Sequence, residues 1–381
     1  MDITIHPGKL NGIVSVIPSK SQAHRLLICA AFADKQTTLI CPETNRDIEA
    51  TADCLTALCA KIRRTDDGYT IDPIENIPET ALLNCCESGS TLRFMLPIVG
   101  ALGVDTTFQM EGRLPQRPLS PLWEEMERMG CTLTRPTAST IRCQGKLQQG
   151  NYQIDGSVSS QYVTGLLFAT ALNGSHLEVT GKIESKPYID MTKQAMALFE
   201  SPKFRTPGTI KVEGDWSNGA FWLAAKALNS DISVLNLEEN SPQGDRKVAQ
   251  ILPALQENIT IDAADIPDLV PILSVVAASN KGATFTNIQR LRLKESDRVV
   301  STMAMVENLG GKAEATDATL TIHGTGLTGG TVDSFNDHRI AMATAIASTT
   351  CSAPVTILGA QCVQKSYPRF WEEFSRLGGK I

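Results

Sequence analysis

The sequence predicts an α/β (α+β) protein made of six similar units around buried helices. One phrase occurs six times: an apolar strand end, a polar turn, and then a helix rich in alanine and leucine, at 17–33, 85–102, 155–172, 214–228, 265–278 and 335–348. The helical part of each phrase is too apolar for a solvent-exposed surface, which indicates a buried helix. Repetition at a period of about 50–70 residues points to duplicated supersecondary units.

Three further segments resemble one another and predict β-hairpins between the helices. Residues 58–73, 126–143 and 305–324 each contain a Gly turn followed by alternating β-branched residues. This alternation is typical of strands with one buried face. The strands therefore belong to the same repeated units as the buried helices.

Length and composition are those of an ordinary globular protein. A chain of 381 residues with 42% hydrophobic and 20% charged residues fits two domains or one large domain. The N-terminus lacks an apolar signal core, and no stretch approaches the ~20 apolar residues of a membrane span, so we expect a cytoplasmic protein. The net charge of −6 argues against a nucleic-acid-binding surface. Ten scattered cysteines without a CxxC pair are expected to be buried free thiols, and neither a metal site nor a cofactor is expected.

The polar residues of the repeated phrase lie where helices begin, and helix N-termini attract anions. The first phrase places Lys20, Ser21 and Arg25 around one helix start. Taken alone, this turn is also explained by a capping serine and two exposed cations. A lysine beside the positive end of the helix dipole is unfavourable, however, and a bound anion would relieve that conflict.

Cations and hydroxyls at the other turns extend this argument. Seven cations lie at helix starts or turn edges of an acidic protein: Lys20, Arg25, Arg117, Lys294, Arg298, Arg339 and Lys365. If they converge on one cleft they repel one another, so we expect a ligand with several negative charges. Uncharged groups at Ser159, Ser160, Gln161 and Ser185 suit a polyhydroxylated ligand. The phrase at 214–228 has no Lys or Arg at its helix start and is expected to be mainly structural.

The fifth phrase carries two carboxylates, Asp265 and Asp268, beside an apolar run. Desolvation raises the pKa of a carboxyl group, which suits a general base near neutrality. A helix-capping aspartate is an equally simple explanation. Asn336, Asp337, His338 and Arg339 open a buried helix and need partners there.

The ordered motifs SKSQAHR, ESGSTLR, QRP, SSQ, SKPYIDMT, DIPD, KESDR, NDHR and QKSYP resemble the 5-enolpyruvylshikimate-3-phosphate synthases (3-phosphoshikimate 1-carboxyvinyltransferases), which are enolpyruvyl transferases. The resemblance covers essentially the whole chain. It implies a two-domain inside-out α/β barrel with six βαβαββ-type units and buried parallel helices. One domain would comprise residues 14–213 and bind shikimate phosphate. The other would combine residues 1–13 and 214–381 and carry the acid and base.

The resemblance also implies the reaction and its residues. The 5-hydroxyl of shikimate 3-phosphate would attack phosphoenolpyruvate, and a tetrahedral intermediate would lose phosphate, in a monomer that uses no cofactor. Shikimate 3-phosphate would be held by Ser21, Arg25, Ser159, Ser160, Gln161, Ser185, Asp268 and Lys294. Phosphoenolpyruvate would be held by Lys20, Gly89, Arg117, Gln161, Arg298, Arg339 and Lys365. The catalytic residues would be Asp268 as base, Glu295 as acid, and Lys20.

Two departures and two alternatives follow from the same comparison. Glu87 and Arg290 stand where family members often have an uncharged residue. Because Gly89 lacks the methyl group that blocks glyphosate in tolerant members, competition between glyphosate and phosphoenolpyruvate is implied. A UDP-N-acetylglucosamine enolpyruvyl transferase would carry a Cys in the loop at 110–118, which has none. A non-catalytic anion-binding protein of the same fold would not need Asp268 and Glu295.

Overall fold

The computed structural model describes all 381 residues and contains two compact units. The N-terminal unit is Pro18–Glu213, and the C-terminal unit combines Met1–Ile17 with Gly214–Ile381. This division lies four residues after the predicted boundary between residues 13 and 14 and agrees with the predicted boundary after residue 213. The reason is strand pairing: β2 (Asn11–Ser15) pairs in parallel with β13 (Asp231–Leu235), and the Val16 N–H continues the ladder by donating to the Leu235 carbonyl at 3.0 Å.

Three sheets form the N-terminal unit, and two of them share one strand pattern, in which a parallel pair continues into an antiparallel hairpin. The first contains, in spatial order, β12 (Thr209–Lys211), β3 (Thr37–Ile40), β5 (Gly68–Asp72) and β4 (Lys61–Thr65). The second contains β6 (Thr80–Asn84), β7 (Asp105–Gln109), β9 (Thr140–Gly145) and β8 (Cys131–Thr137). The third is the parallel pair β10 (Asn151–Asp155) and β11 (His176–Thr180).

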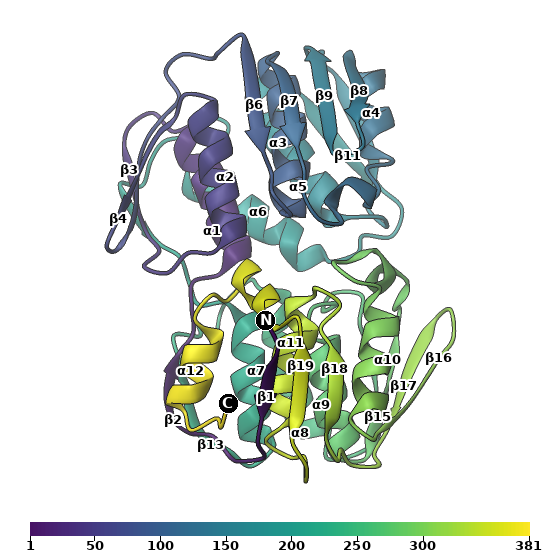
Figure 1. Cartoon of the computed structure of the whole chain (residues 1–381). Coiled ribbons are helices and arrows are strands. Elements are labelled where there is room, and N and C mark those ends of the chain that lie inside the picture. Colours follow the sequence, from purple (N-terminus) through teal and green to yellow (C-terminus); the bar gives the residue numbers. More distant parts are fainter. The chain divides into compact units, whose positions relative to one another are not determined.

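Six α-helices accompany these strands (Figure 1). They are α1 (Lys20–Ala31), α2 (Arg46–Ala57), α3 (Gly89–Leu102), α4 (Leu122–Arg128), α5 (Ser160–Asn173) and α6 (Lys186–Leu198), with the short 3-10 helix η1 (Leu114–Gln116). Helix α3 packs on α5, and α1 packs on α2 and α6.

The C-terminal unit repeats the same strand pattern once. Its four-stranded sheet contains β14 (Ile259–Asp262), β15 (Gly282–Thr286), β17 (Thr319–His323) and β16 (Lys312–Ala315). A second sheet contains β1 (Ile3–Ile5), β19 (Val355–Leu358) and β18 (Gly330–Asp333), which are neighbouring arrows in Figure 1. The third is the β2–β13 pair.

The helices of this unit are α7 (Trp216–Ala227), α8 (Val248–Ala254), α9 (Val270–Ser279), α10 (Arg298–Asn308), α11 (His338–Ala347) and α12 (Phe370–Arg376). Three 3-10 helices join them: η2 (Gly244–Lys247), η3 (Gln289–Leu293) and η4 (Ala360–Lys365). Helices α7, α9 and α11 contact one another.

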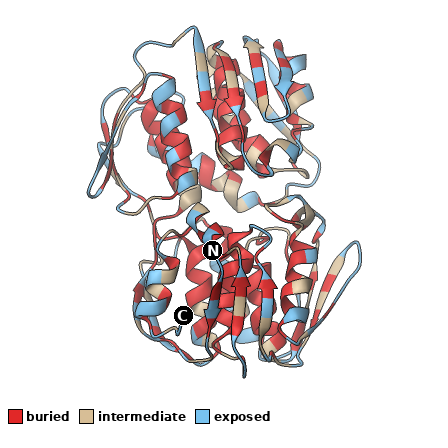
Figure 2. Cartoon of the chain, in the orientation of Figure 1, coloured by how far each residue is buried: buried red, intermediate tan, exposed pale blue.

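The six helices expected to be buried are confirmed as α1, α3, α5, α7, α9 and α11 (Figure 2). All ten residues of α11 are buried, and nine of the ten in α9. The three predicted hairpins are confirmed as β4–β5, β8–β9 and β16–β17. Three stretches, β2 to β5, β6 to β9 and β14 to β17, follow the chain order βαβαββ, although β2 pairs with β13 instead of joining the sheet of β3 to β5. The other sheets differ, so the number of repeats stays a prediction.

Side-chain caps fix where the helices begin. Ser88 accepts the Thr91 N–H at the start of α3, and Asp215 accepts the Asn218 N–H at the start of α7. Such caps satisfy N–H groups that have no partner within the helix, and each contributes about 1 kcal/mol. Gly103 ends α3 with φ +77°, a left-handed conformation that favours glycine.

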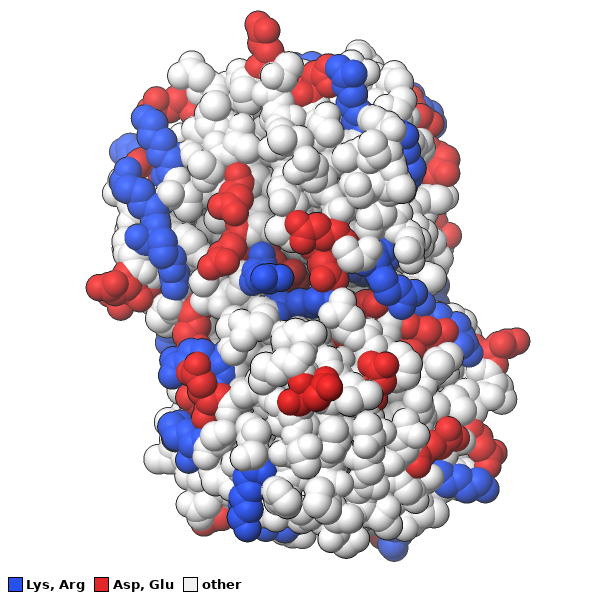
Figure 3. Space-filling model, viewed as in Figure 1, with Lys and Arg blue, Asp and Glu red and all other residues white.

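Each unit has its own hydrophobic core. In the C-terminal unit Trp222 stacks on Phe370 with ring centroids 5.2 Å apart, and in the N-terminal unit Phe94 packs on Phe168 at 6.4 Å. No helix of the structure combines the length and the apolar character needed to cross a membrane. Both signs of charge occur on the visible face of each unit (Figure 3).

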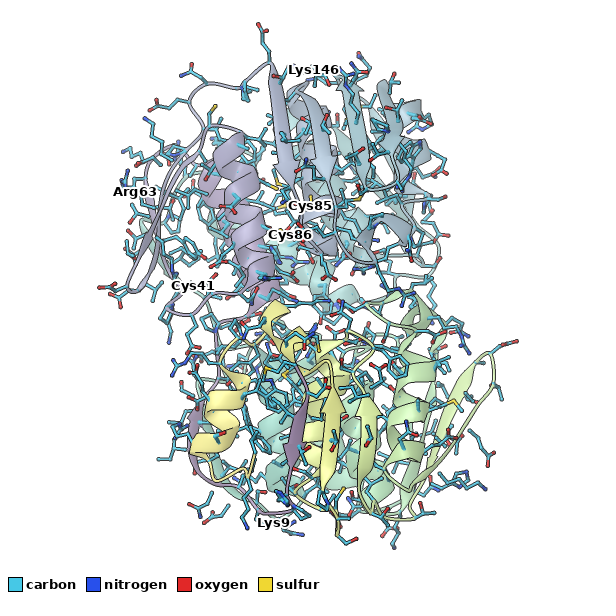
Figure 4. The ribbon with its side chains drawn as sticks, viewed as in Figure 1. Lys9, Cys41, Arg63, Cys85, Cys86 and Lys146 are labelled. Atoms are coloured by element: carbon cyan, nitrogen blue, oxygen red, sulfur yellow. The ribbon has the colours of Figure 1, made fainter.

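All ten cysteines are free, and eight of them are buried. Burial raises the pKa of the Cys41 thiol to about 12 and that of Cys362 to about 11, which keeps these thiols protonated. Cys85 and Cys86 follow the end of β6 (Figure 4), directly before the start of α3.

Candidate active site

In the N-terminal unit, Lys20 and Ser21 occupy the first turn of α1. The Lys20 ammonium lies 2.9 Å from the Asp47 carboxylate at the start of α2. The Asp47 carboxylate therefore offsets the unfavourable interaction between the Lys20 charge and the helix dipole. This pairing was not predicted from the sequence. Both side chains remain partly exposed, at 16% and 17%, so Lys20 stays accessible to a ligand.

Arg25 is buried on the same helix and is held by several oxygens. Its Nε donates to Thr192 Oγ1 at 2.8 Å, and Nη2 donates to the Tyr188 carbonyl at 3.0 Å. Burial lowers the pKa of Arg25 to about 10, which leaves the guanidinium charged at neutral pH. The same side chain joins α1 to α6, the helix that Ser185 precedes.

Gly89 opens α3 directly against two guanidinium groups. A Cβ added at Gly89 would lie 2.5 Å from Nη1 of Arg93 and 2.5 Å from Nη1 of Arg117. Arg93 is buried and donates to the Pro118 carbonyl, whereas Arg117 is half-buried and its buried Nε has no hydrogen-bond partner. A buried donor without a partner beside a helix N-terminus is a group that a bound anion can satisfy.

Replacing Gly89 with alanine should raise the KM for an anion bound here by about tenfold, since the new methyl group displaces Arg117 and one charged hydrogen bond is worth about 1.5–3 kcal/mol. Steady-state kinetics in which the concentration of the anionic substrate is varied measure this effect. Gly8→Ala is the control, because a Cβ added at Gly8 would meet its nearest atom, Lys380 Cε, at 3.5 Å, an ordinary contact distance. Gly174 at the end of α5 is unsuitable, because its φ of +72° would strain an alanine. An unchanged KM in Gly89→Ala would contradict the prediction.

The start of α5 contributes the uncharged groups. Ser159 caps this helix by accepting the Gln161 N–H at 3.2 Å, and Ser160 is buried in the first turn. The Gln161 amide donates to Ser90 Oγ at 3.0 Å, which connects α5 to the start of α3. Ser185 is buried before α6 in a left-handed conformation, φ +52°. Ser90 was not predicted from the sequence.

Glu87 lies two residues before Gly89, and Arg113 follows Gly112 in the loop before η1. A Cβ added at Gly112 would lie 2.4 Å from Glu87 Oε2, so the carboxylate of Glu87 lies against Gly112. Arg113 is exposed, in contrast to Arg117.

In the C-terminal unit, one fully buried arginine organises the charged residues. Arg298, 1% exposed, donates to Asp268 at 2.5 Å, to Glu295 at 2.6 Å and to Asp337 at 2.9 Å. The position of Arg298 follows from the helix cap. Asp297 caps α10, so Arg298 lies in the first turn of this helix, where it is buried. Three carboxylates around one guanidinium satisfy a charge that burial alone would make very costly.

Asp268 also contacts two further cations. Arg339 Nη2 lies 3.2 Å from its Oδ2, and Lys294 Nζ lies 3.9 Å from its Oδ1. Burial raises the pKa of Asp268, but Arg339, Arg298 and Lys294 outweigh burial and hold this pKa well below its usual value. The expectation of a raised pKa is therefore wrong for the chain without ligands, because desolvation was considered without these three cations.

Lys294 is shifted in the opposite direction. Burial and the nearby Arg290 and Arg298 lower its pKa to about 8, although Asp268 partly opposes them. The ammonium is 22% exposed, so a ligand can reach it. A lysine with this pKa is mostly charged at pH 7 and mostly neutral at pH 9.

Arg339 and Lys365 complete the cluster. Arg339 is buried at the start of α11 and donates to the carbonyl and the hydroxyl of Ser217 at 3.0 and 2.8 Å. Ser217 lies in the first turn of α7, so the helix start expected to be mainly structural also holds a site residue. Lys365 ends η4 and donates to the Asn336 carbonyl at 3.0 Å.

The seven cations are thus distributed as three in the N-terminal unit and four in the C-terminal unit. The four in the C-terminal unit are accompanied by three carboxylates, Asp268, Glu295 and Asp337, which reduces the self-repulsion expected from the sequence. Asp337 was noted only as a residue that needs partners. No group of three or more His, Cys, Asp or Glu side chains is arranged to hold a metal ion. The chemistry available is anion binding with partly exposed carboxylates beside the cations.

Comparisons with known proteins identify the family of the chain. The family model described as EPSP synthase (3-phosphoshikimate 1-carboxyvinyltransferase) matches residues 5–374. The 3-phosphoshikimate 1-carboxyvinyltransferase of Clostridium kluyveri is 37% identical over 416 residues, covering 100% of this chain and 98% of the relative. That of Clostridioides difficile is 36% identical over 428 residues, with the same coverage.

Solved structures show the same fold. An EPSP synthase from Acinetobacter baumannii matches with a TM-score of 0.78 and 22% identity, covering 99% of this chain and 98% of the other. The enolpyruvyl transferase NikO from Streptomyces tendae matches with a TM-score of 0.72 and 15% identity, covering 99% and 97%. These matches confirm the predicted two-domain inside-out α/β fold.

Proposed function

Because the chain belongs to the family of EPSP synthases (3-phosphoshikimate 1-carboxyvinyltransferases), we propose how its own residues carry out the transfer that defines this family. That reaction moves the enolpyruvyl group of phosphoenolpyruvate to the 5-hydroxyl of shikimate 3-phosphate and releases phosphate. It makes the chain a transferase of the shikimate pathway. A monomeric state and a cytoplasmic location stay predictions.

For shikimate 3-phosphate we propose a set of residues that joins hydroxyls and an amide to cations. The set is Ser21, Arg25, Ser159, Ser160, Gln161, Ser185, Asp268 and Lys294. The hydroxyls suit the alcohol groups of the ring, and Arg25 and Lys294 suit its phosphate and carboxylate. The fixed position of Arg25, held by Thr192 and the Tyr188 carbonyl, supports this role because a preorganised cation loses little freedom on binding.

For phosphoenolpyruvate we propose Lys20, Gly89, Arg117, Gln161, Arg298, Arg339 and Lys365. The orphaned Nε of Arg117 beside the start of α3 supports this assignment in the N-terminal unit. In the C-terminal unit the orphaned Nε of Arg339 supports it in the same way.

The addition step needs one proton removed and one delivered. We assign removal from the 5-hydroxyl to Asp268 and delivery to the methylene carbon of phosphoenolpyruvate to Glu295. An anionic substrate that pairs with Arg298 and Arg339 weakens their effect on Asp268, while burial of this carboxylate remains. The pKa of Asp268 then rises from its low value, so the base becomes effective when phosphoenolpyruvate is bound.

The observation that carries this mechanism is the pair of carboxylates on one buried arginine, Asp268 at 2.5 Å and Glu295 at 2.6 Å from Arg298. Simple anion binding gains nothing from them. The test is phosphate release by the purified protein given phosphoenolpyruvate with either shikimate 3-phosphate or UDP-N-acetylglucosamine. Release that requires shikimate 3-phosphate is expected. Release that requires UDP-N-acetylglucosamine, or none with either acceptor, would overturn the proposal.

The KM for shikimate 3-phosphate should rise above pH 8, by up to about tenfold per pH unit, because the Lys294 ammonium loses its proton there. Below pH 8 the lysine is charged, and the KM should be nearly flat until the substrate itself is protonated. Lys294→Arg keeps its charge throughout and should flatten the profile between about pH 7 and pH 9, roughly one unit either side of this pKa. An equal rise in both proteins would exclude Lys294 as its source.

A further inference from the structure

Four hydrogen-bonded side chains cross the interior of the N-terminal unit from α1 through α2 to the start of α3. His24 Nδ1 lies 2.7 Å from Thr51 Oγ1, and Thr51 Oγ1 lies 2.7 Å from Thr91 Oγ1. The Thr91 hydroxyl donates to Ser88 Oγ at 2.7 Å. All four residues are 0% exposed, and we call them the His24–Ser88 chain.

The hydrogen bonds of this chain run in one direction. Ser88 Oγ accepts from the Thr91 hydroxyl and also from the Thr91 N–H at 3.2 Å. The Thr91 hydroxyl donates to Ser88 Oγ at 2.7 Å and has a second, longer acceptor in the Asp47 carbonyl at 3.4 Å. Because the proton of Thr91 is used in this way, its oxygen accepts from Thr51, and Thr51 in turn accepts from His24 Nδ1–H. His24 Nε2 is then a bare lone pair, which fits its buried position without a partner. Burial, together with Lys20 and Arg25, holds the pKa of His24 well below its usual value and keeps the ring neutral.

The chain ends on the residue that sets the start of α3. Ser88 is the N-cap of this helix, and Gly89 is its first residue. Fixing the Ser88 hydroxyl fixes the cap, and the cap fixes the direction of the Gly89 and Ser90 N–H groups. Lys20 lies at the start of α1, the helix that carries His24, so the chain also links the two helix starts.

We propose that His24, Thr51 and Thr91 are positioning residues for phosphoenolpyruvate, holding the start of α3 in register with the start of α1. The inference rests on the proposed function, in which Gly89 and Lys20 bind this substrate. None of the three residues touches the substrate; they act through Ser88.

Packing alone does not require this arrangement. Valine has nearly the shape of threonine without a hydroxyl that must find a buried partner. Apolar contacts are non-directional and leave helices free to slide by small amounts, whereas hydrogen bonds of 2.7 Å between three helices define their positions. A misplacement of about 1 Å is enough to weaken a binding site strongly.

The test compares Thr51→Val with three other variants. Thr91→Val cuts the same chain one link closer to Ser88, and Thr51→Ser restores the hydroxyl. Thr170→Val is the matched control, because Thr170 is buried in the same unit but bonds only to the Leu166 and Leu167 carbonyls of its own helix.

In Thr51→Val and Thr91→Val the KM for phosphoenolpyruvate should rise about tenfold, the cost of one lost buried hydrogen bond, while kcat and the KM for shikimate 3-phosphate change less than about twofold. Thr51→Ser should return the KM to near the wild-type value. Hydrogen–deuterium exchange of residues 86–92, measured without substrates, should speed up in both valine variants and stay unchanged in Thr170→Val.

Three outcomes would overturn the inference: an unchanged KM for phosphoenolpyruvate, an equal rise of the KM for both substrates, or the same changes in Thr170→Val. The exchange measurement separates this inference from the proposed function. If the wild type releases no phosphate with shikimate 3-phosphate, the proposed function fails, whereas unchanged exchange at 86–92 in both valine variants shows that the chain does not hold the start of α3.

Discussion

Replacing Asp268 with alanine should lower kcat by at least about a hundredfold, since a correctly placed base contributes about 10²–10⁴ in rate. The KM for phosphoenolpyruvate should stay the same or fall. Asp268 is the partner of Arg298, Arg339 and Lys294 at 2.5, 3.2 and 3.9 Å, so its removal leaves three cations with less competition for an anionic substrate. Steady-state kinetics with each substrate varied in turn measure both effects.

Asp265→Ala is the matched control for this variant. Asp265 lies three residues earlier, on the other side of Pro267, and pairs with Lys247 at 3.1 Å. Its loss should change kcat less than about twofold, as expected for an exposed ion pair. Asp268→Asn, which keeps the shape of the side chain, should be impaired like the alanine variant. Wild-type turnover in Asp268→Asn would remove Asp268 as the base.

Replacing Glu295 with glutamine should also lower kcat by at least about a hundredfold, with little change in KM. Glutamine keeps a side-chain carbonyl oxygen that can accept a hydrogen bond from Arg298, which lies 2.6 Å from the Glu295 carboxylate in the wild type. The glutamine amide cannot deliver a proton to carbon. The variant therefore removes proton transfer by residue 295 while keeping the hydrogen bond that holds Arg298.

Deuterium uptake gives a direct readout of that proton. If the carbon is protonated reversibly, the enzyme exchanges solvent deuterium into the methylene group of phosphoenolpyruvate in the presence of shikimate 3-phosphate. Glu295→Gln should slow this exchange as much as turnover. Glu372→Gln is the control, since Glu372 pairs with Arg369 at the same spacing of three residues on an exposed surface. Slow turnover with wild-type exchange would assign the proton to another group.

Local pattern predicted the elements of this fold well. The six buried helices and three hairpins follow from runs of apolar residues and from turn residues that lie close together in the sequence. The start of α3, for example, is set by Ser88 and the Thr91 N–H, three residues apart. The unit to which β2 belongs depends on a distant partner, because β2 pairs with β13, more than 200 residues later in the sequence.

Pairs of residues distant in the sequence were not predictable. Lys20 meets Asp47 across 27 residues, and Arg339 meets Ser217 across 122. The low pKa of Asp268 has the same origin, since Arg339 lies 71 residues away in the sequence. Residue type and spacing indicated which groups bind anions, but the charge each group experiences depends on neighbours that only the folded chain brings together.

The discontinuous C-terminal unit has a consequence for synthesis. Strands β1 and β2 are made before the N-terminal unit, yet β1 pairs with β19 and β2 with β13, which are made after the whole of that unit. The N-terminal unit is continuous, and the Ser19 N–H donates to the Glu213 carbonyl at 2.8 Å, so its two ends meet. It has the organisation of an inserted domain that can fold while still tethered. β2 therefore stays unpaired until β13 is made, and β1 stays unpaired until β19 is made close to the end of synthesis.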